Sequence, residues 1–491
     1  MKTCRRSAEL VVLLLVASLA AYIYASTAYE LYAIEVERGG RGYVTDETWY
    51  ASSARVVLCK LFGAEPKQDE GYGATVVFAW RPSPTLVQGI AKGLGLKART
   101  DFENLPAVYI SGDKNAVYAF IEAINESHRV VDVVPGWIMP DNSGINSYIN
   151  WEHPPLGKYL VSLVMLLFGD TPFYWRTPVV TLGVFTAILV YLSILKLTGS
   201  VVASALGAAL AAIDPLSRAV FSIVLLDGYV AFFAVLSLYM ALSKRYRLAL
   251  FTAAIGGLFK ASGLFTALPL ALLVSWDEAS SGGKRSLWRF AFSLLYYLFI
   301  VAVLYLSLLT LASIPLISYM GLSSWFNTAL VGALKWHLST KCTGPSCPIS
   351  SAPWDWLMGQ NSFTLYIYPS GEAVYARGLV PLWALSLALV VLFVPLTLRD
   401  MRKNVSPLML YAGIWLGYIL IWALGSRTQY SFYAIHLEPL VYINAASFMY
   451  AIIADSDVLL KALRAWREAL GLFAKALKRL PWFLKAITIA L

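Results

Sequence analysis

Charged residues are scarce in this sequence of 491 residues. Asp, Glu, Lys and Arg make up only 14% of it, whereas a soluble domain carries about 25%. Hydrophobic residues make up 58%, and the mean hydropathy is +0.64. A soluble globular enzyme, a disordered chain and a fibrous repeat are therefore excluded, because none of them could hide so much apolar surface. The apolar residues form long unbroken runs instead of alternating, which excludes a membrane β-barrel and predicts a polytopic helical membrane protein.

Cysteine is also scarce, with four residues in the chain. Four cysteines are too few for a disulfide scaffold in a chain of this length. Cys342 and Cys347 lie close together in one polar loop and could pair outside the cell, but the spacing alone leaves this open.

Ten apolar runs approach the roughly 20 residues that a membrane span needs. The first, near 10–33, follows a basic start, so a signal peptide is the alternative. The run is longer than a signal core and ends without a clear cleavage site, which favours a retained span. The other nine runs lie near 174–197, 199–213, 228–243, 248–259, 261–276, 290–314, 379–398, 407–425 and 434–454.

The net charge of 39 − 29 = +10 is interpreted as a topology signal rather than as a nucleic-acid surface. With the N-terminus inside, the basic clusters at 244–247, 284–285 and 399–403 all fall on the cytoplasmic side. The tail 455–491 repeats apolar and basic residues, which predicts an amphipathic helix on the cytoplasmic leaflet, with an eleventh span as the alternative. The segments predicted to lie outside are 34–173, 214–227 and 315–378.

The first outer segment is unusually large. Strands are expected at 74–80, 107–111 and 130–134, and helices at 85–95 and 115–127. This alternation predicts a small α/β insert that binds an acceptor or a partner. The expected domains are 1–61 (first span and start of the catalytic loop), 62–145 (insert), 146–454 (membrane domain with the outer loop 315–378) and 455–491 (tail).

Polar residues gather in five clusters on the predicted outer side. Each has an ordinary explanation when taken alone: solvated acids, a proline-started helix, or arginines near headgroups. Their concentration on one face favours function, because charge at a membrane edge is costly. The clusters are Asp46-Glu47; His153 to Lys158; Arg176; Asp214, Arg218 and Asp227; and Ser351 to Trp356 with Arg427, Tyr430, Tyr433 and His436.

Taken in order, these motifs resemble the protein O-mannosyltransferase family, membrane glycosyltransferases of the GT-C fold. Asp46-Glu47 is similar to the family's Asp-Glu motif, and residues 153–158 to its His-Pro-Pro-Leu-Gly-Lys motif. Two departures stand out: the insert separates the first two motifs, and 315–378 is too short for the β-trefoil repeats of eukaryotic members. The remaining matches are Arg176, Leu225-Leu226-Asp227, Ser351 to Met358, Tyr375 to Gly378 and Arg427 to Tyr433; Ala434-Ile435-His436 stands where a Tyr-His-Tyr run is usual.

The resemblance implies inverting transfer of mannose from a polyprenyl (dolichyl) phosphate to Ser or Thr hydroxyls of proteins. Asp46 would be the general base, and Glu47 would orient it or bind substrate. Cationic side chains would hold the donor phosphate. The expected phosphate ligands are Arg176, Arg427, Lys158, Arg218 and His436, and the expected substrate-binding residues are His153, Asp227, Trp354, Trp356, Tyr430 and Tyr433. An interfacial aromatic belt is the alternative for the two tryptophans.

This scheme requires no cofactor or metal, although a divalent ion held by Glu152 and His153 or by Asp46-Glu47 remains an alternative. The expected partners are the lipid-linked sugar, a Ser/Thr acceptor protein and membrane lipid, with no nucleic acid; a dimer is left open. Transfer to a lipid-linked glycan or membrane lipid, a transporter or flippase, and a non-catalytic scaffold are the rival functions. The expected location is a prokaryotic plasma membrane, with the active site facing outside.

Overall fold

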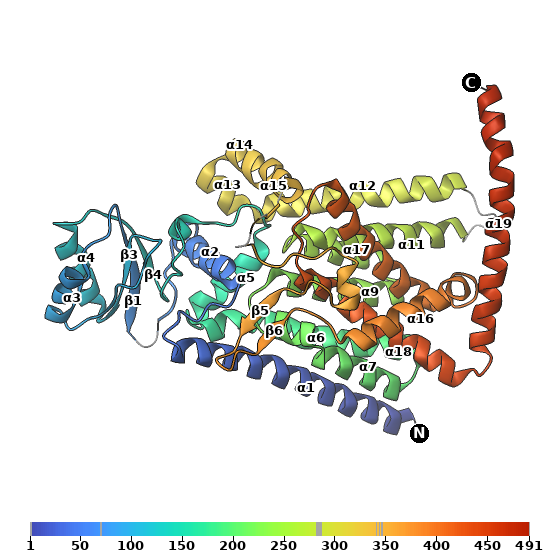
Figure 1. The fold of residues 1–491 in the computed structure, drawn as a ribbon, viewed down its shortest axis with the longest axis horizontal. Coiled ribbons are helices and arrows are strands. Elements are labelled where there is room, and N and C mark those ends of the chain that lie inside the picture. The colour runs from blue at the N-terminus through green and yellow to red at the C-terminus, as the bar shows by residue number, and fades with distance from the viewer. Residues whose placement is uncertain are drawn as a thin grey trace.

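The computed structural model describes residues 2–68, 71–280, 287–339, 341, 342, 344 and 347–490. The predicted basic pair Lys284-Arg285 lies outside the described residues. A helical bundle forms the body of the molecule, with a small sheet module at one end and the long C-terminal helix across the other end (Figure 1). The bundle helices are α1 (Lys2–Glu37), α6 (Pro172–Thr198), α7 (Val201–Ile213), α8 (Pro215–Val220), α9 (Leu226–Leu242), α10 (Tyr246–Gly257), α11 (Ala267–Ser280), α12 (Leu287–Ala312), α16 (Val380–Arg399), α17 (Val405–Leu424) and α18 (Glu438–Ala454).

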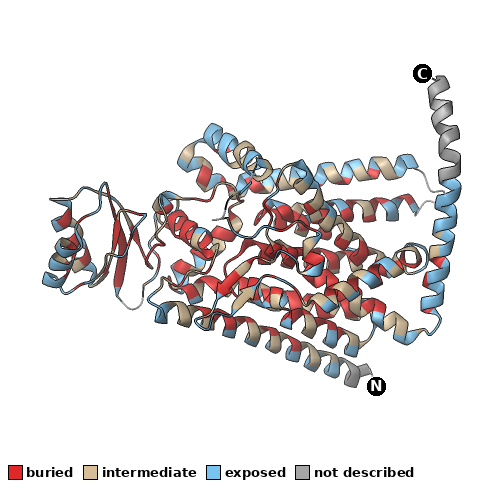
Figure 2. Ribbon diagram, viewed as in Figure 1, coloured by how far each residue is buried: buried red, intermediate tan, exposed pale blue. Residues whose placement is uncertain are grey.

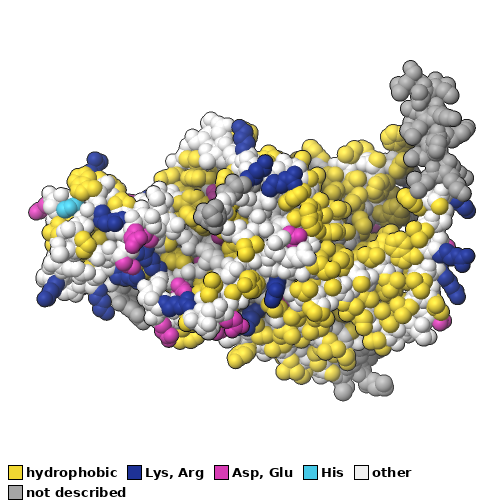
Figure 3. All heavy atoms as spheres, in the orientation of Figure 1, with side chains coloured by type: hydrophobic (Ala, Val, Ile, Leu, Met, Phe, Trp, Pro, Cys, Tyr) yellow, Lys and Arg dark blue, Asp and Glu magenta, His cyan; other side chains and the backbone are white. Residues whose placement is uncertain are grey.

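Several of these helices are long and apolar enough to cross a membrane. In the described part of the chain, α1 from Ser7, α6, α12, α16 and α17 meet this test by length and composition. A sixth is added if α18 and the adjoining part of α19 count as one span bent by 112°. Apolar side chains cover the middle of the bundle, whereas charged side chains gather towards its two ends (Figure 3). The chain is an integral membrane protein that crosses the bilayer several times, as predicted.

Each of the ten predicted runs contains helix. The run near 261–276 begins with a 3-10 segment, η2 (Ala261–Thr266), because the chain breaks at Lys260 between α10 and α11. Buried residues concentrate inside the bundle, and exposed ones line the outer sides of α1 and α12 (Figure 2). An apolar helix satisfies its own backbone hydrogen bonds, so it can face lipid.

The predicted insert is a four-stranded antiparallel sheet with two helices. The strand order β2-β3-β1-β4 with the chain order βαββαβ gives a ferredoxin-like topology. The sequence analysis missed one short strand, Lys97–Arg99, because three residues give no readable alternation. The elements are β1 (Tyr72–Phe78), α3 (Pro84–Gly93), β2 (Lys97–Arg99), β3 (Ala107–Gly112), α4 (Lys114–Asn125) and β4 (Val130–Pro135).

Both faces of this sheet are covered. Val76 and Phe78 pack with Val87 and Phe120 of the module's own helices, while the opposite face packs against α2 (Glu47–Lys60). The module is therefore continuous with the bundle through α2. α2 in turn lies beside α5 (Leu156–Leu167), the helix that begins after the His-Pro-Pro motif.

The late outer loop is not irregular. It contains α13 (Ile314–Met320), α14 (Leu322–Trp325), the π-helical η3 (Phe326–Gly332) and α15 (Ala333–Ser339), which lie beyond the C-terminal end of α12 (Figure 1). A short hairpin, β5 (Thr364–Ile367) with β6 (Ala373–Tyr375), follows. Three short 3-10 segments lie in or next to the stretches predicted to be outside: η1 (Ile145–Ser147), η4 (Asp355–Met358) and η6 (Ser431–His436).

The C-terminal helix α19 (Val458–Ala490) turns away from the bundle direction and runs across the end opposite the module (Figure 1). Trp466 anchors it, since its Nε1 donates hydrogen bonds to the carbonyl oxygens of Val391 (3.1 Å) and Leu392 (3.0 Å). This placement agrees with the predicted surface helix. A turn, η5 (Arg402–Asn404), lies at the same end between α16 and α17.

Candidate active site

A cavity of about 480 Å³ lies between the 151–155 loop, η2, the 426–433 segment and the helices α12 to α15. The helices α12 to α15 supply mostly apolar wall, including Leu316, Trp325 and Leu330. The polar wall comes from segments far apart in the sequence. Its members are Glu152, His153, Lys260, Ser262, His337, Ser426, Thr428, Tyr430 and Tyr433.

Asp46 caps the N-terminus of α2 and lies close to this polar wall. The residue before it, Thr45, has φ of 49°, a left-handed conformation that costs energy outside glycine and often marks functional turns. Among the described residues, the Asp46 carboxylate has neither a hydrogen bond nor an ion pair. Burial raises the pKa of Asp46 to about 6; Lys260 opposes this rise, and Asp227 adds to it. A carboxylate with such a pKa suits a general base at neutral pH.

Lys260 and Asp227 form a buried ion pair beside Asp46. The lysine Nζ lies 2.8 and 3.0 Å from the two Asp227 carboxylate oxygens. The same Nζ lies 3.7 Å from the centre of the Tyr433 ring, close enough for a cation–π contact. The η2 break places this lysine at the cavity, so a cation stands where the sequence shows only a gap between two apolar runs.

Glu47 points away from the cavity and holds Arg176. Both side chains are fully buried, with Arg176 Nε 2.9 Å from Glu47 Oε1 and Nη2 2.7 Å from Oε2. The Glu47 carboxylate also accepts hydrogen bonds from the backbone N–H groups of Val44 and Val224. The Arg176 guanidinium donates hydrogen bonds to the carbonyl oxygens of Ala28 and Gly42. The pair therefore joins α1, α2, α6 and the turn before α9 inside the bundle. The expected phosphate contact of Arg176 stays an untested prediction, since the structure occupies its guanidinium with protein acceptors.

Lys158 holds the His-Pro-Pro loop in shape. Its Nζ is buried and donates to the carbonyl oxygens of Ile149 (3.2 Å), Asn150 (2.5 Å) and His153 (2.9 Å). Its expected phosphate contact also stays a prediction. The loop it closes presents His153 to the cavity, where burial holds the pKa of that imidazole well below its usual range. A neutral His153 can exchange hydrogen bonds with a substrate but cannot balance a phosphate charge.

A second histidine, His337 of α15, faces His153 across the cavity, with 5.2 Å between the ring centres. Its Nε2 lies 3.0 Å from the Glu152 carbonyl oxygen. The Glu152 carboxylate accepts a hydrogen bond from the Tyr148 hydroxyl. In the part of the chain that the structure describes, no three His, Cys, Asp or Glu residues are placed to hold a metal ion.

Arg427 lies at the rim of the cavity, between the lining residues Ser426 and Thr428. Its guanidinium stacks on Trp422 at 3.7 Å, and Trp422 also meets Trp354 with 4.7 Å between ring centres. The exposed Trp354 thus shares one aromatic platform with Arg427. The sequence predicted this proximity of the two late motifs.

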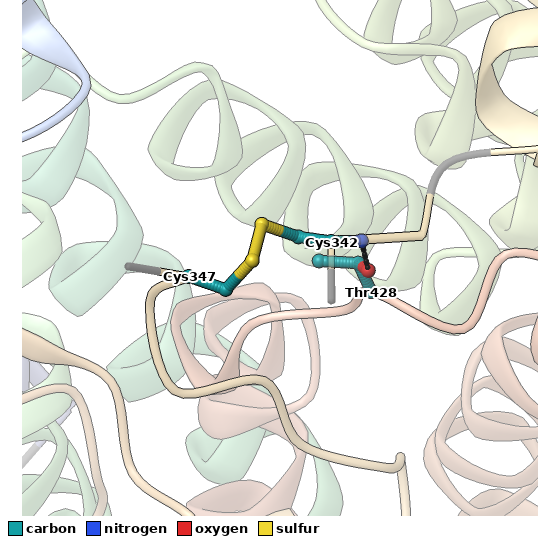
Figure 4. The surroundings of a disulfide bond; sticks show 3 residues. All are labelled: Cys342, Cys347 and Thr428. Atoms are coloured by element: carbon teal, nitrogen blue, oxygen red, sulfur yellow. Dashed lines mark hydrogen bonds between the residues drawn. A yellow bond between two sulfur atoms is a disulfide. The ribbon is translucent and has the colours of Figure 1, made fainter. Parts of the chain in front are cut away.

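Cys342 and Cys347 form a disulfide next to this rim (Figure 4). The Cys342 backbone N–H donates to the Thr428 hydroxyl at 2.8 Å, which ties the disulfide loop to the cavity wall (Figure 4). The pairing that the spacing left open is therefore present.

Three other predicted site residues have different surroundings. Trp356 is 3% exposed and donates through Nε1 to Ser351 Oγ at 2.8 Å, so it packs inside the protein. His436 is buried, with Nε2 3.2 Å from Thr266 Oγ1. Arg218 reaches α1, where its Nε donates to Thr27 Oγ1 at 2.8 Å. Their proposed substrate contacts remain predictions, and the structure places none of the three among the lining residues.

Lys260 and His337, which also line the cavity, were not predicted as site residues from the sequence. Lys260 had a signal, because a lone lysine between two apolar runs is costly in a membrane and by default points to function. His337 had none, since a single histidine in a loop has no characteristic spacing.

Comparison with known proteins adds a family context. No family model matches the chain. Over 129 residues, the chain is 30% identical to a polyprenol-phosphate-mannose–protein mannosyltransferase of Corynebacterium glutamicum, covering 25% of each chain. The similarity is to protein mannosyltransferases. An enzyme of the same name from Mycobacterium tuberculosis is 33% identical over 102 residues, or 20% of each chain.

These matches confirm the resemblance read from the motifs. The matched part spans about a quarter or less of the curated relatives' length. Among solved structures, ArnT from Cupriavidus metallidurans bound to undecaprenyl phosphate superposes with a TM-score of 0.40 at 17% identity, covering 66% of this chain and 53% of that one.

Proposed function

We propose that this protein is a membrane glycosyltransferase of the GT-C type that moves mannose from a polyprenyl phosphate to Ser or Thr hydroxyls of proteins. One observation carries the proposal: the Asp46 carboxylate, which has no hydrogen bond or ion pair to other described residues, lies close to Lys260, a buried cation of a cavity with a largely apolar wall. The names of the relatives supply the sugar and the acceptor class.

In this scheme the acceptor hydroxyl attacks the anomeric carbon from the side opposite the phosphate. A bond forms between the hydroxyl oxygen and this carbon, while the bond from carbon to phosphate oxygen breaks and its electron pair stays on the phosphate. Asp46 accepts the hydroxyl proton. No general acid is needed, because the leaving phosphate is already stable as an anion, and the scheme includes no metal.

Lys260 is the main phosphate ligand in this proposal. It lines the cavity, and its charge is held in place by Asp227 and by the Tyr433 ring. A fixed cation in a poorly solvated site stabilises developing negative charge better than a mobile one in water. Arg427 at the rim is the second cation within this group of segments, and it is free to turn from Trp422 towards a phosphate.

The apolar wall from α12 to α15 suits the prenyl chain. Leu316, Trp325 and Leu330 line it, and the neighbouring Leu322, Phe326 and Leu334 are exposed towards the surroundings of the bundle. A lipid donor entering sideways from the bilayer would contact apolar surface along its whole path. This arrangement supports a lipid-linked sugar over a soluble nucleotide sugar, and it puts the reaction at the module end, the predicted outside.

Membranes containing the protein are expected to transfer label from polyprenyl-phosphate [¹⁴C]mannose to Ser/Thr-linked protein. The label should be released by β-elimination and should be absent from membranes that carry Asp46→Asn. Label found in a glycolipid but in no protein would replace the proposed acceptor with a lipid-linked one. Binding of the donor lipid without transfer to any acceptor would contradict the enzyme assignment.

The pH dependence of transfer should follow Asp46. Because a general base works only when deprotonated, kcat/KM is expected to fall as the pH drops through about 6, roughly tenfold per unit below it. Above pH 7 the profile should be flat on this account. The measurement is initial rates at sub-saturating donor between pH 4.5 and 8.5.

Lys260→Met provides the control for this profile. Removing the cation that stabilises the Asp46 carboxylate should move the acid limb to higher pH as well as lowering the plateau. Lys260→Met leaves the Asp227 carboxylate buried without its partner, which could destabilise the protein. The double variant Lys260→Met/Asp227→Asn removes this charge and checks that a loss of activity is not a loss of folding. An unmoved acid limb in the single variant Lys260→Met would show that a group other than Asp46 sets it.

A further inference from the structure

A second cavity, of about 520 Å³, lies at the opposite end of the bundle from the candidate active site. It is formed where the turn between α9 and α10 meets the last turn of α11 and the flank of α12, the end crossed by α19 (Figure 1). Nothing in the proposed reaction uses it. Its lining residues are Lys244, Arg245, Tyr246, Arg247, Leu248, Val274, Asp277, Glu278 and Tyr297.

The cations of this pocket are more available than its acids. Glu278 accepts hydrogen bonds from Ser293 Oγ (2.6 Å) and Tyr297 Oη (2.5 Å), so both of its carboxylate oxygens already have protein partners. Asp277 lies 3.7 Å from Lys244 Nζ. Arg245 and Arg247, by contrast, are exposed, and their guanidinium groups make no hydrogen bond or ion pair to other described residues. Two guanidinium groups are therefore left to meet an anion, and their planar donors suit phosphate.

The pocket lies at the level where a bilayer meets water. Trp276, directly before Asp277, is 56% exposed, and Trp288 at the start of α12 is 85% exposed. Exposed tryptophans of this kind mark the membrane interface. Further along α12, Tyr296 beside the lining residue Tyr297 is 51% exposed and Ile300 is 40% exposed, so exposed apolar side chains lead from the pocket along this helix. A molecule with a charged head and apolar chains fits this sequence of surfaces.

We propose that this pocket binds the phosphate headgroup of an anionic phospholipid, with Arg245 and Arg247 as the phosphate ligands and the acyl chains lying along α12. The exposed apolar residues of α12 next to Tyr297 favour a lipid over free phosphate, since free phosphate would gain nothing from them. Basic residues close to a leaflet surface attract anionic lipids in general; here the pocket adds a defined place for one headgroup.

The test is native mass spectrometry of the purified full-length protein in detergent, with phosphatidylglycerol or phosphatidylcholine added. Wild-type protein is expected to retain phosphatidylglycerol in preference to phosphatidylcholine. The double variant Arg245→Gln/Arg247→Gln should lose about tenfold or more of its phosphatidylglycerol affinity, because two charge contacts disappear. Both side chains are exposed, so the variant is expected to fold, which a thermal-unfolding curve checks.

The matched control is Lys196→Gln/Lys403→Gln, which removes two exposed cations from the same end of the bundle outside the pocket. It should change phosphatidylglycerol affinity by no more than about twofold. An equal loss of phosphatidylglycerol affinity in both double variants would show that general surface charge attracts the lipid, and it would overturn the proposed binding pocket. Displacement of the lipid by millimolar inorganic phosphate would overturn the lipid assignment in favour of a free phosphate ion.

Discussion

Asp46→Asn is expected to lower kcat/KM for sugar transfer by about 10²- to 10⁴-fold, the range a positioned general base contributes. Asparagine has nearly the same shape but cannot accept the hydroxyl proton. The Asp46 carboxylate makes no hydrogen bond or ion pair to other described residues, so the loss should fall on the chemical step rather than on the fold. The measurement is the initial rate with a synthetic Ser-containing peptide and a mannosyl polyprenyl phosphate.

Two controls separate this effect from damage elsewhere. The thermal midpoint of Asp46→Asn should match that of the wild type, and donor binding should persist, because Lys260 remains in place. Asp46→Glu keeps a carboxylate on a longer side chain and should recover part of the rate. If Asp46→Asn turned over at the wild-type rate while expressing normally, the proposed base would be wrong.

Substitution of the neighbouring acid, Glu47, is expected to affect the stability of the protein instead of the chemical step. Glu47→Gln should destabilise the protein by about 3–5 kcal/mol, because it leaves the fully buried Arg176 without its counter-charge. The pair joins four segments through bonds to Val44, Val224, Ala28 and Gly42, so its loss should loosen the outer end of the bundle. Thermal unfolding in detergent measures the effect, and a lower yield of folded protein should accompany it.

The double variant Glu47→Gln/Arg176→Met tests whether the unpaired charge of Arg176 causes this destabilisation. If the cost of Glu47→Gln is an unpaired buried charge, then removing the second charge should restore part of the stability. Asp46→Asn is the matched control, since it removes the same charge one residue away. A Glu47→Gln protein that is as stable as the wild type but fails to bind the donor would instead make Glu47 a substrate ligand.

Asp46 and Glu47 show how much of the site could be predicted from the sequence. It predicted that Asp46-Glu47 belongs to the site, because two charges beside a span are costly and stand in a motif. It could not assign one acid to the cavity and the other to the interior. That division depends on α2 beginning between them: a helix start turns successive side chains by about 100°, so neighbours in sequence face different partners.

Arg176 and Lys260 also show that the sequence does not reveal which charged residues lie near the cavity. Arg176 was expected to face the donor because it begins a span after an outer segment, yet its partners come from residues 28, 42 and 47. Lys260 was not predicted as a site residue, although it interacts electrostatically with Asp46, Asp227 and Tyr433. The Arg176 contacts bridge more than a hundred residues and the Lys260–Asp227 contact bridges 33, and no local pattern records them.

Composition and periodicity were enough to determine the membrane class, the helical runs and the alternating strands and helices of the insert. These properties follow from local physics, because an apolar run must satisfy its backbone by forming helix and an alternating run suits a half-buried strand. The order of the polar motifs also indicated the family. Only the tertiary structure decided which charges are paired, which line the cavity and which meet at the far pocket. The reason is that a charge in a poorly solvated interior depends on neighbours within a few ångströms, and the fold alone brings those neighbours together.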